Sequence, residues 1–177
     1  MRNKVMTGNM NINLCKGIGK VKFGMKEHEV FEILGSPSKI GLDSDDNRKY
    51  LYYNDIQMRI SIFQNYDDRV GYIEVTSDNT RIGNIKVMGV NVNDFIFKDF
   101  AYKLRWIKNE YDFFDVYSID DLLVTIQSEF DKIIRFEMGT LISDDDEYIW
   151  DEQSMDEYLK KVLSNSVLKE SEVVIEE

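Results

Sequence analysis

Apolar side chains follow a helical spacing in a few stretches of the chain and a strand spacing in many more. The clearest helical stretch holds Val30, Ile33 and Leu34, which share one face because residues three and four positions apart are neighbours on a helix. Gly35 suits a C-terminal cap, and Pro37 cannot continue a helix. The pattern predicts a short helix that ends at the glycine.

Strand periodicity dominates the residues that follow. Over 56–63 the chain alternates between an apolar and a more polar set, which are Ile56, Met58, Ile60 and Ile62 against Gln57, Arg59, Ser61 and Phe63. Residues 48–53 are rich in aromatic side chains, and residues 69–76 alternate in the same way. With a strand over 21–23, the first half predicts a strand, a helix and a three-stranded antiparallel meander.

The second half of the chain repeats this order. A strand is predicted over 85–88, and a helix with an apolar stripe follows it, formed by Phe97, Phe100, Ala101 and Leu104. Three further strands are predicted over 111–117, 122–129 and 132–138. The best match between the halves aligns 68–75 with 131–138, at a constant offset of 63 residues. We therefore expect a tandem duplication.

These patterns predict an α+β fold with two tandem β-α-β-β-β repeats, each packing one helix on an antiparallel sheet, plus a C-terminal helix. A capping-box pattern that begins at Ser154 predicts this last helix over about 155–163. Ile60 and Ile126 lie in mid-strand on apolar faces, so we expect them in the core. The chain then divides into a polar N-terminal lead-in, two repeat lobes and an acidic C-terminal segment: residues 1–16, 17–80, 81–142 and 143–177.

The helix carries a further pattern, Gly-Met-x-x-x-Glu-Val-x-x-x-Leu-Gly-x-Pro, which runs from Gly24 to Pro37. It resembles the helix signature of the small-lipoprotein family of the outer-membrane β-barrel assembly machine. The β-lactamase-inhibitor protein shares that helix-on-sheet fold and is itself a tandem duplication. The resemblance implies a similar architecture here, with a surface that grips another protein.

The composition is typical of a folded cytoplasmic protein. The chain is 43% hydrophobic and 12% aromatic, which is enough for a packed core. Cys15 is the only cysteine, so no internal disulfide can form and a reducing compartment fits best. No apolar run approaches the ~20 residues of a membrane span, and residues 1–15 lack the apolar core of a signal peptide. We expect a cytoplasmic location and no membrane partner.

Charge is distributed unevenly along the chain. Residues 143–177 hold 12 acidic and 3 basic side chains, which accounts for −9 of the net charge of −11. Residues 1–142 are therefore nearly neutral. Nucleic-acid binding requires a basic surface to neutralise phosphate, and the sequence has no basic cluster of that kind. We expect no nucleic-acid partner.

The sequence offers little material for catalysis or metal binding. His28 is the only histidine, and it lies among polar helix positions that predict a solvent-exposed side chain. Cys15 has no obvious base near it in sequence, which favours a small buried residue over a reactive thiol. No nucleophile triad, phosphate-binding glycine loop or clustered metal ligands are recognisable. We expect a protein without cofactor that is not an enzyme.

The remaining candidate is the sheet face that the helices leave uncovered. It would carry Gln57, Arg59, Phe63, Tyr72, Glu74, Thr125, Gln127, Arg135 and Glu137. Aromatic residues and arginines among short polar groups are typical of a protein interface. An ordinary solvated sheet face is an equal alternative, because antiparallel sheets often expose one side to water.

Together these features favour a non-catalytic cytoplasmic module that binds another protein. Its most specific form is an immunity protein that inhibits a basic toxin, with the acidic end supplying complementary charge through Asp144, Asp145 and Asp146. A small-ligand binder with a cleft between the two lobes is an alternative. An enzyme of unrecognised type is a third.

Overall fold

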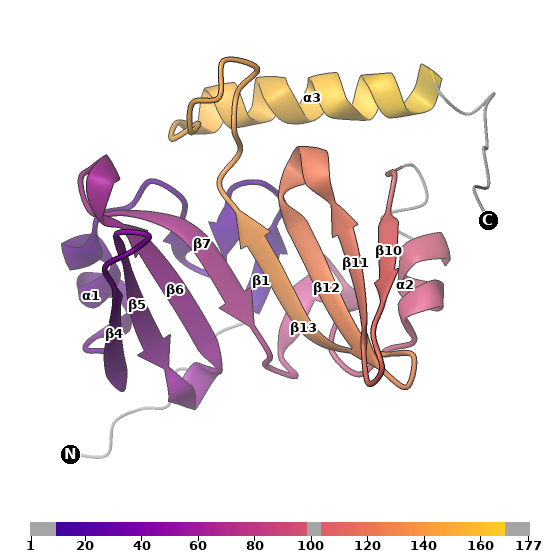
Figure 1. Ribbon diagram of the computed structural model, residues 1–177, viewed down its shortest axis with the longest axis horizontal. Coiled ribbons are helices and arrows are strands. Elements are labelled where there is room, and N and C mark those ends of the chain that lie inside the picture. Colours follow the sequence, from indigo (N-terminus) through magenta and orange to yellow (C-terminus); the bar gives the residue numbers. More distant parts are fainter. Residues whose placement is uncertain (1–9, 99–103, 169–177) are drawn as a thin grey trace.

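The computed structural model describes residues 10–98 and 104–168, and these form two sheets and three α-helices (Figure 1). The larger sheet has eight strands in the order β10-β11-β12-β13-β7-β6-β5-β4. In chain order these strands are β4 (Lys39–Asp43), β5 (Arg48–Tyr53), β6 (Met58–Phe63), β7 (Arg69–Val75), β10 (Ile107–Glu110), β11 (Asp115–Ile119), β12 (Val124–Glu129) and β13 (Lys132–Gly139). Every neighbouring pair in it is antiparallel.

The smaller sheet has five short strands in the order β3-β2-β1-β8-β9. They are β1 (Met10–Asn13), β2 (Gly17–Ile18), β3 (Val21–Lys22), β8 (Thr80–Ile82) and β9 (Ile85–Lys86). The helices are α1 (Glu27–Leu34), α2 (Val92–Lys98) and α3 (Glu152–Leu168). Single 3₁₀ turns, η1 (Asn54–Ile56), η2 (Gln64–Tyr66) and η3 (Asp120–Leu122), connect strands of the larger sheet.

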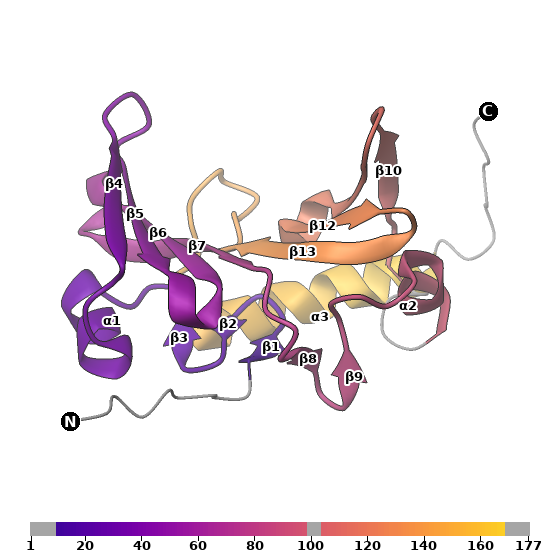
Figure 2. The same cartoon turned by 90° about the horizontal axis from the view of Figure 1, so that it is seen from below.

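The core lies between the two sheets. In Figure 2 the five-stranded sheet and α3 lie on one side of the eight-stranded sheet, while β4 and β10 bend towards the other side. We call these two sides the inner and the outer face. Ile60, Ile73 and Phe136 on the inner face are fully buried. The backbone N–H of Cys15 donates to Sδ of Met138 at 3.2 Å, so the smaller sheet packs directly against β13.

The helix α1 forms where the sequence predicts it. The N–H of Lys26 donates to Oε2 of Glu29 at 2.7 Å, which satisfies one free donor at the first turn. Gly35 closes the helix with a positive φ of 77°, and its N–H donates to the carbonyl of Phe31 at 2.8 Å. Val30 is its fully buried residue. The predicted end of this helix at Gly35 is confirmed.

The predicted α+β fold with two helix-on-sheet repeats is wrong. The protein is mostly β, and a single eight-stranded sheet replaces the two separate sheets. The two halves join because β7 and β13 pair with each other, which satisfies backbone groups that two separate sheets would leave at open edges. With 8 and 7 residues, α1 and α2 are too short to cover such a sheet, and the five-stranded sheet covers much of it instead.

The second predicted helix also differs in detail. Among the side chains of α2 that the structure describes, Val92, Phe95 and Ile96 are buried, and they precede the predicted stripe. Phe100 and Ala101 lie outside the described residues. The helix begins at Val92, and Asn91 caps it by accepting the N–H of Asn93 at 3.0 Å, as expected for a residue type that favours this position.

The chain ends differ from the prediction as well. The helix α3 begins at Glu152, and Oδ1 of Asp151 accepts the N–H of Ser154 at 2.8 Å. Asp151 is therefore the cap, and Ser154 lies inside the first turn. The predicted polar lead-in contains β1, whose Met10 and Ile12 are buried. The outer parts of the two terminal segments, residues 1–9 and 169–177, lie outside the described residues.

Ile60 and Ile126 are both fully buried on the inner face, which confirms their predicted place in the core. Replacing either one by Ala should lower the free energy of unfolding by about 2–5 kcal/mol, because it removes buried methyl groups and leaves a cavity. Chemical denaturation monitored by circular dichroism measures this loss. Ile107→Ala on β10 is the matched control, since Ile107 is 39% exposed and should change stability by less than about 0.5 kcal/mol.

Candidate functional site

Cross-strand pairing aligns one outer-face residue from every strand of the larger sheet in a single row. From β4 to β10 the row reads Lys39, Tyr52, Arg59, Glu74, Glu137, Thr125, Ser118 and Ile107. Two carboxylates, Glu74 on β7 and Glu137 on β13, are directly opposite each other at the centre of the row. Like charges in this arrangement destabilise a sheet unless cations compensate them.

Two arginines and a tyrosine supply this compensation. Nη2 of Arg59 donates to Oε2 of Glu74 at 2.6 Å. Arg135 lies between the carboxylates, with Nε 3.8 Å from Oε1 of Glu74 and Nη1 3.6 Å from Oε1 of Glu137. The hydroxyl of Tyr72 donates to Oε2 of Glu137. We call these five residues the outer-face network.

The outer-face network is partly buried and not fully satisfied. The side chains of Glu74 and Glu137 are only 14% and 19% exposed. Burial, followed by the hydrogen bond to Glu137, raises the pKa of Tyr72, so its hydroxyl stays protonated and donates. Within the described part of the chain, Nε of Arg59 and Nε of Arg135 are buried without a hydrogen-bond partner. Both guanidinium groups therefore keep unused donor capacity.

Beside this network, four aromatic side chains pack together, and we call them the aromatic cluster: Phe63, Tyr66, Tyr148 and Trp150. The Phe63 and Tyr148 ring centroids are 5.2 Å apart, and those of Tyr66 and Tyr148 are 4.8 Å apart, both edge-on. The guanidinium carbon of Arg48 lies 3.1 Å from the Phe63 ring centroid. The segment before α3 thus crosses the outer face where β6 ends and β7 begins.

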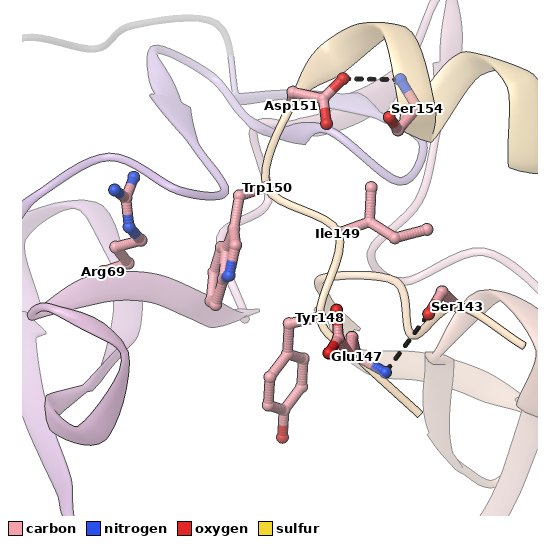
Figure 3. Close-up of a pocket in the computed structure, with 8 residues that line it drawn as sticks. All are labelled: Arg69, Ser143, Glu147, Tyr148, Ile149, Trp150, Asp151 and Ser154. Atoms are coloured by element: carbon pink, nitrogen blue, oxygen red, sulfur yellow. Dashed lines mark hydrogen bonds between the residues drawn. The ribbon is translucent and has the colours of Figure 1, made fainter. Parts of the chain in front are cut away.

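An open hollow of about 490 Å³ borders the aromatic cluster (Figure 3). Its lining combines Arg69 from β7 with residues of the loop before α3 and of its first turn, which are Ser143, Glu147, Tyr148, Ile149, Trp150, Asp151 and Ser154. The backbone of this segment is held in place, because Ile149 N–H donates to the carbonyl of Leu141 at 2.8 Å and Thr140 Oγ1 donates to the carbonyl of Ile149 at 2.5 Å. The hollow is therefore built on an anchored loop.

Two glycines permit these close approaches. The ring of Phe63 covers Gly71, where an added Cβ would lie 2.3 Å from a ring carbon. Gly24, the first residue of the helix motif, has a φ of +85°, and a Cβ there would lie 2.9 Å from the carbonyl oxygen of Trp150. Only glycine fits either position without displacing the neighbour. The motif glycine therefore lies where the C-terminal segment contacts the first half of the chain.

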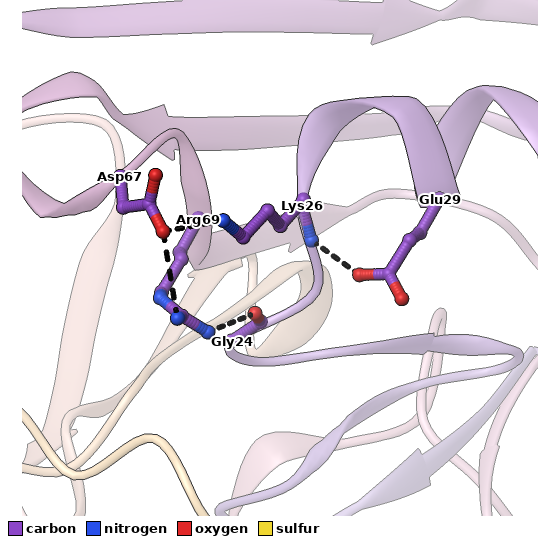
Figure 4. A network of polar contacts seen from close by, with 5 residues as sticks. All are labelled: Gly24, Lys26, Glu29, Asp67 and Arg69. Carbon is purple, nitrogen blue, oxygen red and sulfur yellow. Dashed lines mark hydrogen bonds and ion pairs between the residues drawn. The ribbon is translucent and has the colours of Figure 1, made fainter.

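A polar network ties α1 to the same region (Figure 4). Nη1 of Arg69 donates to the carbonyl of Gly24 at 3.1 Å, and Nη2 of Arg69 lies 3.7 Å from Oδ2 of Asp67. Nζ of Lys26 also donates to the Asp67 carboxylate, which lowers the pKa of that carboxyl. Arg69, which lines the hollow, is thus oriented by contacts to the helix motif.

The predicted interface residues divide into three groups. Arg59, Tyr72, Glu74, Arg135 and Glu137 meet in the outer-face network, and Thr125 and Gln127 are half-buried beside it on β12. Gln57 is exposed in the turn after η1 with a φ of 52°, and Phe63 is buried in the aromatic cluster. Whether any of them contacts a partner stays a prediction.

The acidic residues predicted as partner contacts lie on the loop between β13 and α3. Asp144, Asp145 and Asp146 are all exposed there, and Nζ of Lys161 on α3 donates to the Asp144 carboxylate. Tyr66, Tyr148 and Trp150 are not among the residues that the sequence predicts for the site. Tyr148 and Trp150 lie inside an acidic loop, and large aromatic side chains are seldom left fully exposed to water. Their presence there could have indicated that this loop packs against another part of the protein.

Among the described residues there is neither a cluster of metal-ligating side chains nor an exposed cysteine. They contain no group of three or more His, Cys, Asp or Glu side chains placed to hold a metal ion. His28 is exposed, whereas Cys15 is fully buried and burial raises its pKa to about 12. In the parts of the chain described above, no helix combines the length and apolar composition required to span a lipid bilayer.

Comparison with known proteins adds little to this geometry. No protein-family model matches the sequence, and no curated protein sequence matches it. One solved structure, an extracellular protein containing a SCP domain from Bacillus anthracis str. Ames, aligns at 12% sequence identity with a TM-score of 0.43. The alignment covers 66% of this chain and 43% of that structure. The resemblance carried by the helix motif stays a prediction.

Gly71→Ala should lower the free energy of unfolding by about 1–3 kcal/mol, because the new methyl group displaces the Phe63 ring. Denaturant titration measures the loss. The loss caused by Gly71→Ala should be smaller in a protein that already carries Phe63→Leu, because the smaller side chain leaves room for the methyl group. Gly41→Ala is the matched control, since a Cβ there makes only ordinary contact at 3.4 Å. Equal losses for both glycines would show that the ring does not lie over Gly71.

Cys15 should react with a thiol reagent far more slowly in the folded protein than in the unfolded chain. The pKa rises from 9.0 to about 12, so at pH 9 the folded protein holds roughly two to three orders of magnitude less thiolate. Absorbance with a disulfide reagent, with and without denaturant, measures both rates. Comparable rates would mean that the thiol is accessible in the native state.

Proposed function

We propose that the protein is a non-catalytic, cytoplasmic protein-binding module that contacts its partner through the outer face of the larger sheet. The observation that carries this proposal is the outer-face network. It places two arginines, a tyrosine and two carboxylates together on a face towards which both edge strands bend (Figure 2). A partner that enters this curved face contacts the network and the row of side chains across the sheet.

The chemistry of this face supports protein recognition. Arginine and tyrosine are enriched among the residues that contribute most to interface energies. Arg59 and Arg135 are each about one-third exposed, so their guanidinium groups are oriented by the glutamates and still reach solvent. Their free Nε donors give a partner's carbonyl or carboxylate oxygen a place to bind after a small side-chain adjustment. Such preorganisation reduces the entropy lost on binding.

The acidic loop favours a partner with a basic surface. Asp144, Asp145 and Asp146 project from the loop whose following residues line the hollow, and the whole chain carries a net charge of −11. Complementary charge speeds association more than it strengthens the final complex. An immunity protein that blocks a basic toxin, such as a nuclease, is the specific form of the proposal that combines this charge with a non-catalytic face.

The hollow favours small-ligand binding as a second candidate function. Its volume of about 490 Å³ is within the range of ligand sites, and it combines aromatic rings with one arginine. It differs in position from the predicted cleft between two lobes. Arg69 and the segment before α3 form it, at one end of the larger sheet.

The first experiment uses the full chain as bait in the source organism and then measures binding of the captured partner. Arg135→Ala should weaken binding by roughly tenfold or more, as expected for a central arginine in an interface. Lys132→Ala is the matched control, because it removes the same charge from an exposed position on the same strand. Thermal unfolding checks that both variants fold. Equal affinities for the two variants would contradict a role for the outer face.

The same binding assay tests the acidic loop. Replacing Asp144, Asp145 and Asp146 together by Asn should slow association and change dissociation less, with a smaller effect at high salt because the Debye length is about 8 Å at physiological ionic strength. Stopped-flow mixing at low and high salt measures both rates. An association rate that responds to neither salt nor the triple change would remove the case for a basic partner.

A further inference from the structure

The edge strand β4 presents apolar side chains and unpaired backbone together. It is the last strand of the eight-stranded sheet, and among the described residues no strand pairs with its outer edge. Ile40 and Leu42 are 50% and 73% exposed, although they lie beside Leu51 and Lys49 on the inner-face side. Natural edge strands usually carry proline, a bulge or inward-pointing charge that prevents pairing. Residues 39–43 have no proline, and their two charges lie at the ends.

The sequence of β4, Lys-Ile-Gly-Leu-Asp, is complementary to itself when it runs antiparallel. A twofold axis through Gly41 places Lys39 opposite Asp43 of the second copy, and Ile40 opposite Leu42 of the second copy. Paired residues lie on the same face of a sheet, so the two charge pairs form on the outer face and the apolar pairs on the inner face. Shifting the register by two residues breaks both charge pairs. The charges therefore select one alignment.

Contacts within the chain hold both charged side chains near the ends of the strand. Nζ of Lys39 lies 5.6 Å from the ring centroid of Tyr52, its neighbour on the outer face. Oδ1 of Asp43 accepts the backbone N–H groups of Asp45 and Asp46 at 3.1 and 3.3 Å, which leaves Oδ2 for a cation. These contacts fix one charge at each end of the strand.

The opposite edge of the sheet lacks this complementarity. On β10, Lys108 is bound within its own chain, since Nζ donates to Oε1 of Glu110 at 2.5 Å and lies 3.3 Å from Oδ2 of Asp115. Antiparallel self-pairing there would set Ile107 opposite Glu110 or displace these contacts. Pairing β4 with β10 of another copy would be head-to-tail and leave open edges at both ends. Of these pairings, β4 with β4 is the one that closes as a symmetric pair and also matches complementary residues.

We propose that two copies of this chain associate through antiparallel pairing of their β4 strands, which joins the two larger sheets into one. The backbone hydrogen bonds and the four apolar side chains hold the pair, and the two Lys39–Asp43 ion pairs set its register. The axis is perpendicular to the sheet, so both outer faces open on the same side. This surface is separate from the outer-face network, which lies on β6, β7 and β13.

Sedimentation velocity of the full chain over a concentration series tests the proposal. The wild type should show a reversible dimer, and Leu42→Lys should weaken self-association by roughly tenfold or more, because it places a charge in the apolar pairs. Ile107→Lys on β10 is the matched control and should leave the dimer unchanged. A wild type that stays monomeric up to about 100 μM, or equal effects of the two variants, would overturn the proposal.

An exchange of charges tests whether the Lys39–Asp43 ion pairs set the alignment of the two β4 strands, or whether the strands associate without a fixed alignment. Lys39→Glu and Asp43→Lys should each weaken self-association, since each sets like charges opposite one another in both pairs. Mixing the two variants should restore association, because the mixed pair has opposite charges at both positions. Circular dichroism checks that each variant is folded. Folded variants that fail to associate when mixed, or that each dimerise as the wild type does, would contradict the assigned pairing.

Discussion

The pairing of β7 with β13 is the interaction on which the rest of this structure depends. It joins two four-stranded meanders into one sheet and thereby creates a continuous inner face for the five-stranded sheet to cover. It also brings Glu74 and Glu137 face to face, an arrangement that is unfavourable by itself. Arg59, Arg135 and Tyr72 offset that repulsion, so the junction requires the same residues that give the outer face its polar character.

A second constraint is the return of the chain across the end of the larger sheet. After β13 the chain contacts β7, passes Gly24 at the start of α1, and packs Tyr148 and Trp150 on Phe63 before α3 begins. Gly71 and Gly24 are the positions where backbone must lie close to another segment. The aromatic cluster therefore holds the first and last parts of the chain together, and the hollow beside it is a consequence of that packing.

The two exposed regions of the larger sheet differ in chemistry and suit different tasks. The outer face offers oriented charges and aromatic rings for a partner of another kind. The β4 edge offers backbone groups and a short self-complementary sequence for a second copy. Because a twofold axis at β4 is perpendicular to the sheet, self-association leaves both outer faces accessible. A partner on the outer face and a second copy at the β4 edge can therefore bind at the same time.

Local periodicity in the sequence located β5, β6, β7, β12 and β13 and the side that most of their residues face, but it did not predict the edge strands β4 and β10. Ile60 and Ile126 in the core, and Arg59 and Arg135 on the opposite side, follow from the two-residue repeat of a strand, which depends only on neighbours in sequence. The end of α1 at Gly35 follows from equally local chemistry.

Tertiary structure alone decided how the two meanders associate. A repeat offset of 63 residues does not show that the matching strands β7 and β13 pair with each other, because that choice depends on edges brought together only in the folded chain. The five-stranded sheet has strands of two to four residues, too short for a readable period. Phe63 and Gln57 also differ from their predicted surroundings, since a loop covers Phe63 on the outer face and a left-handed turn holds Gln57 outside β6. Such contacts between distant segments carry no local signal.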